Sequence, residues 1–432
     1  MPESLEIDVH HVTRVEGHGN LVLRAKDGKI EKLEWQVPEA PRFFEAMVRG
    51  RKYDEIQPIV SRICGICSIT HSFASTKAVE DALGVKVHPD TDWVRLLTHY
   101  AEQMQSHVLH VGYLVAPDLF GVKSVVPLVS THLEVVKKII ALHRLANEWS
   151  DLLAGRTTHP TTFRVGGFTR YPTFQELAAL KKRLEESIPT LQQVVDVVLS
   201  AAGKMPDFKR DTEYIALKNA GEYSFYHGEI ASTDTKEITP IQKFESVINE
   251  YVSPQSTAKW AKWHRDSYMV GALARFNINY DQLLPLAKGV AAKFGMKPPV
   301  TNTFLNSVAQ LVECAQVAER SIHILDDLLT RRPKFENVDP KVKAGNGAGC
   351  VEAPRGILFH RYVFDDRGIC QSANISIPTN QNHGNIQKDI EALVPAILSE
   401  GKDAVRLKME MLVRAYDPCI SCSTHYLDVK FV

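Results

Sequence analysis

Cysteine is scarce in this sequence, which has seven in 432 residues. Small extracellular domains that rely on disulfides contain far more cysteine for their length, and a chain this long can bury a hydrophobic core that needs no such bridges. A secreted protein stabilised by disulfides is therefore not the expected class. We expect a reduced, intracellular protein whose few cysteines serve a chemical purpose.

The sequence also lacks an excess of charge of either sign, because 51 Lys and Arg residues balance 51 Asp and Glu residues. A nucleic acid or an anionic membrane surface is therefore not predicted as the main partner. No run of about 18 apolar residues occurs, and the opening segment MPESLEIDVHHVTRVEG lacks the apolar region of a secretory signal. We expect a cytoplasmic protein with neither a membrane span nor a secretory leader.

No linker rich in Pro, Gly or Ser, no low-complexity tract and no internal repeat divides the chain. We therefore expect a single domain over residues 1–432. An N-terminal hairpin is predicted at about 5–36, around the turn residues Asp27 and Gly28, and a lobe with short strands at about 207–258.

Apolar residues at helical spacing dominate the remaining sequence. One of these segments begins with a capping box, Thr173 to Glu176, and is expected to kink at Pro189. The predicted fold class is mainly α with peripheral β (α+β), built on a core of long helices. The helical segments are 91–112, 130–155, 173–203, 303–331 and 384–415.

Four of the seven cysteines form two Cys-x-x-Cys pairs at opposite ends of the chain. Cys64 and Cys67 lie in RICGICSITH, and Cys419 and Cys422 lie in DPCISCSTH. One pair alone fits a redox motif or half of a zinc site, whereas two pairs supply the four thiolates of one closed metal site. Zinc ribbons take their pairs from a few tens of residues, but almost the whole chain separates these two. We expect a buried site whose thiolates hold nickel, iron or a cluster, with structural zinc as the alternative.

Together with four further segments, the two cysteine pairs resemble the large, catalytic subunit of nickel-iron hydrogenases of the cytoplasmic, heteromultimeric, bidirectional type. The resemblance implies reversible heterolytic cleavage of H2 into protons and electrons at a nickel-iron centre whose iron carries CO and cyanide ligands. The further segments, which follow the order of the family, are RVEGHG (14–19), SHVLHVGYLVAPD (106–118), GRTTHPTTFRVGG (155–167) and EAPRGILFH (352–360).

The resemblance assigns a role to each cysteine of the two pairs. It implies that Cys64 and Cys419 bind nickel alone, and that Cys67 and Cys422 bridge nickel and iron. His71, four residues after Cys67, is implied to donate a hydrogen bond to a bridging sulfur. Without the motif, a single histidine is more often a structural residue.

Two further residues are implied to act on protons and on bound H2. Glu16 in RVEGHG matches the family's proton-transfer glutamate, expected within hydrogen-bond reach of Cys419; the alternative is a turn residue beside Gly17. Arg355 in EAPRG matches the arginine above the open side of nickel, held by Asp118 and Asp417. The alternative is an ordinary buried group of ion pairs.

The same resemblance implies two sets of supporting residues. The first set, Pro354, Leu358 and Thr379, surrounds the diatomic ligands of iron. The hydroxyl of Thr379 is implied to donate a hydrogen bond to a cyanide nitrogen. The second set binds magnesium or another divalent ion through oxygen-rich ligation: Glu45, the carbonyl of Ile375, and His425. For Glu45, a helix cap or salt bridge is the alternative.

The remaining cysteines, Cys314, Cys350 and Cys370, are not spaced as metal ligands, and GNGAGC (345–350) is not placed as a dinucleotide loop. No iron-sulfur cluster is therefore expected in this chain. The implied partners are an obligate iron-sulfur small subunit, further electron-transfer subunits for a soluble acceptor, and a maturation protease. We expect that protease to remove the tail YLDVKFV (426–432), which follows His425. The alternative is that the tail persists and that Cys422 stays away from the metals in a precursor.

Two other functions remain open. The quinone-site subunit of respiratory complex I resembles this family but lacks the metal-binding cysteines, so the four cysteines here argue against such a silent relative. An H2-sensing regulatory hydrogenase or a zinc-structured, non-catalytic relative is the other alternative.

Overall fold

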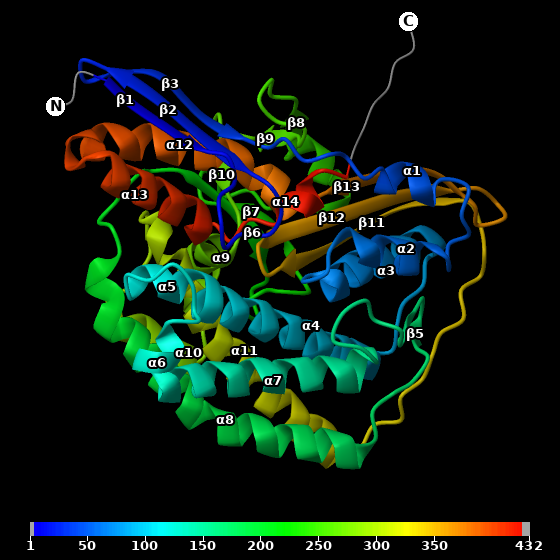
Figure 1. The fold of residues 1–432 in the computed structure, drawn as a ribbon. Helices are drawn as coiled ribbons and strands as arrows, with labels where there is room; N and C mark the ends of the chain where they lie inside the picture. Colours follow the sequence, from blue (N-terminus) through cyan, green and yellow to red (C-terminus); the bar gives the residue numbers. More distant parts are fainter. Residues whose placement is uncertain (1–3, 426–432) are drawn as a thin grey trace, which may run out of the picture.

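The computed structural model describes residues 4–425, so the tail predicted to be cleaved, 426–432, lies outside the described residues. Helices predominate and the sheets are small (Figure 1). The predicted class, mainly α with peripheral β, is confirmed. Among the helices of residues 4–425, none combines the length and the apolar character needed to cross a bilayer.

A bundle of four long helices forms one side of the molecule (Figure 1). Two of these helices bury one apolar stripe against the others, whereas the other two are buried on most of their faces, polar side chains included. The capping box of Thr173 and Glu176 opens one of them, which continues through Pro189. The bundle helices are α4 (Pro89–Leu109), α7 (Leu133–Ala154), α8 (Phe174–Ala201) and α11 (Asn306–Arg331).

The segment predicted as one helix over 384–415 is two helices, α12 (Pro378–Ile397) and α13 (Lys402–Ala415). Gly401 separates them with a φ of 93°, a conformation that glycine adopts without strain. The shorter helices are α1 (Phe44–Val48), α2 (Ile56–Val60), α3 (Ser68–Leu83), α5 (Ala116–Leu119), α6 (Leu128–Thr131), α9 (Ala272–Asn279), α10 (Pro285–Lys293) and α14 (Ile420–Ser423).

Short 3-10 or π-helical segments join several of these helices. The π-helical segment η2 continues α4 directly into α5. The segments are η1 (Ser61–Ile63), η2 (His110–Val115), η3 (Ala202–Lys204), η4 (Ile241–Ser246), η5 (Tyr280–Gln282), η6 (Thr303–Leu305) and η7 (Leu398–Glu400).

Three small sheets have three strands each. In the N-terminal sheet, Asp27 and Gly28 form the turn between the second and third strands. The sheets are β1 (Ser4–Val9), β2 (Asn20–Lys26) and β3 (Lys29–Gln36); β10 (Tyr268–Met269), β6 (Glu213–Lys218) and β7 (Glu229–Ser232); and β11 (Gly345–Ala353), β12 (Gly356–Phe364) and β13 (Cys370–Ser376). Two-stranded pairs are β4 (Phe163–Arg164) with β5 (Gly167–Phe168), and β8 (Asn249–Tyr251) with β9 (Trp260–Lys262).

Strand β11 and helix α3 pack unusually closely, because the segment GNGAGC places glycine at every second position of the strand. Two residues of a strand advance about 6.8 Å and four residues of a helix about 6 Å, so the glycines stay in step with every fourth residue of α3. A Cβ on Gly345, Gly347 or Gly349 would lie 2.1–2.2 Å from the carbonyl oxygens of Ala82, Ala78 and Ala74, respectively.

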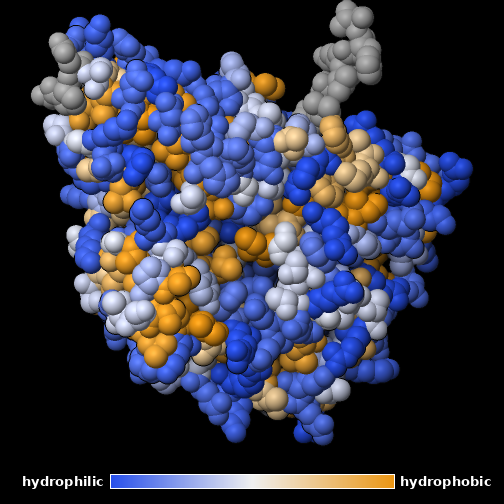
Figure 2. Space-filling model, in the orientation of Figure 1, coloured by the Kyte–Doolittle hydropathy of each residue, from blue (hydrophilic) through white to orange (hydrophobic). Residues whose placement is uncertain are grey.

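The surface seen in Figure 2 is largely hydrophilic, with an apolar area over α6 and the start of α7. The large apolar side chains exposed there are Val126, Val129 and Leu133.

Candidate metal centre

The four cysteines of the two pairs meet in the interior. Their sulfur atoms all lie within 4.8 Å of one another, and each cysteine is at most 5% exposed. Cys64 follows η1 and Cys67 immediately precedes α3, whereas Cys419 and Cys422 lie at α14 near the other end of the chain. The structure brings together the two pairs that the sequence separates, and the sulfurs of Cys64 and Cys419 are 3.6 Å apart.

The sulfur atoms of Cys419 and Cys422 are in contact with each other. Metal binding by all four residues requires them as separate thiolates, so the metal-binding form is the reduced one.

The loop from Cys64 to Cys67 is built to hold negative charge on sulfur. The sulfur of Cys64 accepts hydrogen bonds from the backbone N–H groups of Ile66, at 3.3 Å, and Cys67, at 3.0 Å. Burial opposes ionisation, but hydrogen bonding from Cys67 and the positive charge of Arg355 lower the pKa of the Cys64 thiol. The hydrogen bond with Cys64, and then burial, raise the pKa of Cys67, so ionisation of Cys64 is favoured over that of Cys67.

Glu102 of α4 is a supporting residue that the sequence did not reveal. Cys67 is the N-terminal cap of α3, and its side chain caps no backbone N–H group. The fully buried carboxylate of Glu102 instead accepts the N–H groups of Ile69, at 2.7 Å, and Thr70, at 2.9 Å. The cap comes from a different helix, so no local motif could have predicted it.

Arg355 occupies the two-residue turn between β11 and β12, and its guanidinium is buried. Its Nε donates to the carbonyl of Asp417 at 2.6 Å, and one Nη donates to the carboxylate of Asp417 at 2.8 Å. The other Nη donates to the hydroxyl of Ser106 at 3.2 Å. Burial acts to lower the pKa of Arg355, but the charges of Asp417 and of the cysteines outweigh it and raise that pKa, so the group stays cationic.

Asp118 does not hold Arg355, contrary to our expectation. Among the described residues its carboxylate pairs with Arg14, at 2.5 Å, and Arg414, at 2.7 Å. Asp118 lies twelve residues beyond Ser106 on the continuous path of α4, η2 and α5, which is about 18 Å at a helical rise of about 1.5 Å per residue. Ser106 takes the place in contact with Arg355 that we had given to Asp118.

Glu16 lies beside Cys419, because residues 14–19 run alongside the C-terminal segment as a short parallel bridge. The carboxylate of Glu16 is 3.1 Å from the sulfur of Cys419 and accepts the backbone N–H of Ser421 at 3.1 Å. Glu16 is partly exposed and Cys419 is buried. The carboxyl group therefore connects the buried sulfur with the surface.

His71 is fully buried one turn into α3, and its Nδ1 shares a hydrogen bond of 3.1 Å with Nε2 of His360. Burial lowers the pKa of His71 to about 3, so its ring is neutral. Its Nε2 is buried and has no hydrogen-bond partner among the described residues. A buried polar atom of this kind normally has a partner, and a bound group beside the cysteines would supply one.

Glu45, Ile375 and His425 also meet. The carboxylate of Glu45 accepts the N–H of Ile375 at 2.8 Å, and Nε2 of His425 lies 2.7 Å from the carbonyl of Ile375 and 3.6 Å from Glu45. Burial acts to raise the pKa of Glu45, but the hydrogen bond and charge of His425 lower it overall. A carboxylate, a carbonyl and an imidazole are ligand types suited to a divalent ion.

The three residues predicted near the diatomic ligands, Pro354, Leu358 and Thr379, are all buried. Thr379 is hydrogen-bonded to one of the cysteines, since its Oγ1 accepts the N–H of Cys419 at 3.1 Å. The hydroxyl hydrogen of Thr379 is left to donate elsewhere. The carbonyl of Pro354 accepts from Arg275.

The residues therefore fit a thiolate-bound metal centre: four buried sulfurs converge, a cation stands beside them, and one buried imidazole nitrogen lacks a partner. Soft thiolates suit nickel, iron and zinc alike. A structural zinc site requires neither a carboxyl group in contact with a ligand sulfur, as Glu16 is with Cys419, nor a buried guanidinium such as that of Arg355.

Comparison with known proteins identifies the relatives of this chain. The family model described as nickel-dependent hydrogenase matches residues 42–139 and 204–425. Sulfhydrogenase 1 subunit alpha of Pyrococcus furiosus is 31% identical over 98% of this chain and 98% of its own. The beta subunit of the NAD-reducing hydrogenase HoxS of Cupriavidus necator is 27% identical over 98% and 95%. A solved NAD+-reducing [NiFe]-hydrogenase in the H2-reduced state superposes with a TM-score of 0.88, at 28% identity over 97% and 99%.

Proposed function

Since this chain belongs to the nickel-dependent hydrogenase family, whose members are oxidoreductases that act on H2, we propose that it is a catalytic subunit for reversible heterolytic cleavage of H2. The observation that carries the proposal is the convergence of four buried cysteine sulfurs within 4.8 Å. Because its ligands come from both ends of the chain, we also propose that residues 1–432 form one domain, with 426–432 as a tail that can be cleaved.

The four cysteines would hold the centre, with Cys64 and Cys419 on nickel alone and Cys67 and Cys422 shared between nickel and iron. When bound, the nickel-iron group with its CO and cyanide ligands supplies the site at which H2 is polarised and split. Pro354, Leu358 and Thr379 would enclose the diatomic ligands. The unpartnered Nε2 of His71 would donate to a bridging sulfur.

The chain's own residues would handle the proton and the charge. The carboxylate of Glu16, 3.1 Å from the sulfur of Cys419, would take a proton from that sulfur and release it toward the surface. Arg355 presents a fixed positive charge that Asp417 and Ser106 prevent from moving. A preorganised charge of this kind stabilises charge separation without further rearrangement.

The electrons released from H2 would need a partner subunit to accept them. Cys314, Cys350 and Cys370 lie in α11, β11 and β13, and within residues 4–425 the only group of cysteine, histidine and carboxylate ligands close enough for a metal is the cluster of four cysteines. We propose that an iron-sulfur small subunit binds over Arg62 and Gly65, which are exposed on either side of Cys64. Further cytoplasmic subunits would deliver the electrons to a soluble acceptor, and the similarity to NAD-reducing hydrogenases supports a nicotinamide.

Two finer proposals concern the C-terminal segment. Glu45, the Ile375 carbonyl and His425 would bind magnesium or another divalent ion beside the centre. A maturation protease would cut after His425, which is 1% exposed in the interior, so that the active chain ends there. Intact mass and metal content measured on one active sample test this cut.

Elemental analysis of the purified complex tests the proposed function. We expect nickel and iron at about one each per chain, and loss of nickel in Cys64→Ser, with the partner subunits still bound. A full equivalent of zinc without nickel would instead establish the zinc-structured alternative. Full H2-dependent electron transfer by the isolated chain would contradict the need for a partner.

A further inference from the structure

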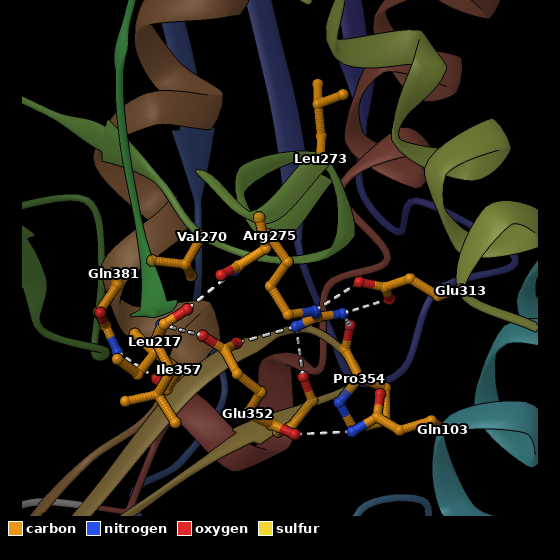
Figure 3. A network of polar contacts seen from close by, with 12 residues as sticks. Gln103, Leu217, Val270, Leu273, Arg275, Glu313, Glu352, Pro354, Ile357 and Gln381 are labelled. Carbon is orange, nitrogen blue, oxygen red and sulfur yellow. Dashed lines mark hydrogen bonds and ion pairs between the residues drawn. The ribbon is translucent and has the colours of Figure 1, made fainter. Parts of the chain in front are cut away.

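Arg275 of α9 lies in a fully buried polar network next to the turn that carries Arg355 (Figure 3). All five of its N–H groups have acceptors. Nε and one Nη donate to the two carboxylate oxygens of Glu313, both at 2.6 Å. The other Nη donates to Glu352 at 2.9 Å. The remaining two N–H groups donate to the carbonyls of Ala353, at 2.9 Å, and Pro354, at 3.0 Å.

Those two carbonyls belong to the residues immediately before Arg355. Ala353 pairs with Gly356, so Pro354 and Arg355 form the two central residues of the hairpin turn between β11 and β12. Turns that fit a two-residue hairpin by themselves have a positive φ at the first central residue. Neither Pro354 nor Arg355 has one. Contacts from outside the turn must therefore contribute to its conformation, and Arg275 provides two of them.

The same network also contacts the helix that carries Ser106, the second side chain that holds Arg355. Glu313 also interacts with the imidazole of His107 at 2.7 Å, and His107 follows Ser106, whose hydroxyl accepts from Arg355. One helical turn before His107, Gln103 donates to the backbone carbonyl of Glu352 at 2.6 Å. Helix α4 and the turn are thus fixed relative to each other through Arg275, Glu313 and Glu352, as Figure 3 shows for most of these side chains.

We propose that Arg275 is a positioning residue for Arg355: by binding the carbonyls of Ala353 and Pro354, it sets where the Arg355 guanidinium stands relative to the four cysteines. The proposal rests on the proposed function, because it presumes that Arg355 acts on the reaction. If Arg275 only neutralised the two buried glutamates, it would not need to donate hydrogen bonds to the backbone carbonyls of the turn. Two of its five donors serve the turn and nothing else.

The test is Arg275→Lys, made in the complete, metal-loaded complex. Lysine keeps the charge but cannot bind two carboxylates and two carbonyls together. We expect unchanged nickel per chain, and a fall in kcat for H2 oxidation of about 10–100-fold, the effect of a displaced catalytic group. Deuterium uptake at residues 353–358 of the same complex should rise, which a purely catalytic defect would not cause.

A double variant separates positioning from general damage. If Arg275 acts through Arg355, the double variant Arg275→Lys with Arg355→Lys should be no slower than Arg355→Lys alone. Arg95→Lys is the matched control, because Arg95 forms an equally buried two-point pair with Glu80 and does not touch the turn. We expect near wild-type kcat and unchanged uptake at 353–358 in this control.

Three results would overturn the inference: wild-type kcat in Arg275→Lys, multiplied losses in the double variant, or an equal loss in Arg95→Lys. If Arg275→Lys does not accumulate, Glu352→Gln, which disturbs one of its carboxylate partners, is measured in the same way and under the same criteria. Wild-type turnover in Arg355→Lys would instead refute the proposed role of Arg355 itself, so the two failures are distinguishable.

Discussion

At the residue scale, Arg355 combines geometry and charge in a way that lysine cannot reproduce. Its guanidinium makes three hydrogen bonds in three directions, two to Asp417 and one to Ser106. In Arg355→Lys the ammonium group can satisfy only part of this arrangement, so its charge will be displaced. We expect unchanged nickel and iron content and a loss of H2 oxidation of about 10²–10³-fold.

The control for this substitution is Arg361→Lys, since Arg361 lies on β12, the strand that follows Arg355, and contacts Asn346 at the surface. That variant should oxidise H2 at the wild-type rate. Wild-type turnover in Arg355→Lys would show that Arg355 is only a structural ion-pair partner.

Glu16→Gln removes the proton-carrying group but keeps a similar shape. The amide oxygen of glutamine can still accept the N–H of Ser421, whereas no carboxylate remains beside the sulfur of Cys419. We expect intact metal content and a fall in hydrogen-deuterium exchange between H2 and water of about 10²–10⁴-fold, the usual contribution of a positioned acid or base.

Glu39 offers a matched carboxylate for this experiment, because it accepts the N–H of His18 close to Glu16 and does not contact a cysteine. Glu39→Gln should exchange hydrogen normally. Equal losses in both variants would mean that the local fold, not the proton on Glu16, limits exchange.

Residue roles were predictable where a motif fixes the chemistry and unpredictable where a contact joins distant elements. The two Cys-x-x-Cys pairs pointed to four thiolates at one site, and the structure places the four sulfurs together. Of the two partners predicted for Arg355, Asp417 contacts it and Asp118 does not, because the position along α4 that faces the turn is Ser106. Glu102 was missed since its target is the start of another helix.

At the scale of elements, the contact of β11 with α3 controls the distance between Arg355 and Cys67. Gly347→Ala would place a Cβ 2.2 Å from backbone atoms of Ala78 and Ala82, which no side-chain movement can relieve. The helix must then shift, and we expect a loss of about 1–3 kcal/mol in the free energy of unfolding. Nickel per chain should fall as well, because Cys67 is the N-terminal cap of α3.

Gly289→Ala is the corresponding control. Gly289 lies in α10, and no atom lies within 4 Å of an added Cβ. Alanine is favoured over glycine in a helix by about 0.5–1 kcal/mol, so this variant should be slightly more stable and bind nickel normally. Unfolding by urea and metal analysis on both variants decide the matter; full nickel retention in Gly347→Ala would refute the link between packing and the centre.

Helix patterns predicted the long elements because each has apolar residues at helical spacing, and four of the five predicted segments match one main helix each. The pattern failed at Gly401, where the apolar period continues into α13 although the backbone turns. GNGAGC was not predicted as a strand, since glycine disfavours strands. Its role depends on a partner helix distant in sequence, which a local pattern does not contain.

At the scale of the whole molecule, the buried network around Arg275 makes stability depend on pH. Burial acts to raise the pKa of Glu313, but the charge and hydrogen bonds of Arg275 outweigh it and lower the pKa from its usual 4.5 to about 2. The unfolded chain therefore binds the proton first as pH falls. The stabilisation from Glu313 is complete above pH 4.5 and is lost as the pH falls through about 2. Burial raises the pKa of Glu352 to about 7, so its contribution has the opposite sign and is lost as the pH rises through about 7.

Glu313→Gln leaves Arg275 without its two-point partner and should cost about 3–5 kcal/mol of the free energy of unfolding at neutral pH. The difference from the wild type should shrink as the pH is lowered from 4.5 toward 2, because the wild type loses the same interaction there. Urea unfolding followed by circular dichroism at several pH values measures this. A difference that stays constant over the range would show that Glu313 is not ionised in the folded chain.

The fold class and the joining of both chain ends at one site were predictable from composition and motif order. The packing that orients the site was not, because it depends on pairs such as Arg275 with Pro354 that are 79 residues apart.

The distance in sequence between the two halves of the centre also has a consequence in time. Cys64 and Cys419 are 355 residues apart, and ribosomes add about 5–20 residues per second. The first pair of thiols therefore emerges roughly 20–70 s before the second. During that interval Cys64 and Cys67 are a half-site that any thiol-seeking ion or oxidant in the cell can reach. Assembly of the correct centre therefore depends on cellular protection of a nascent chain as well as on the finished fold.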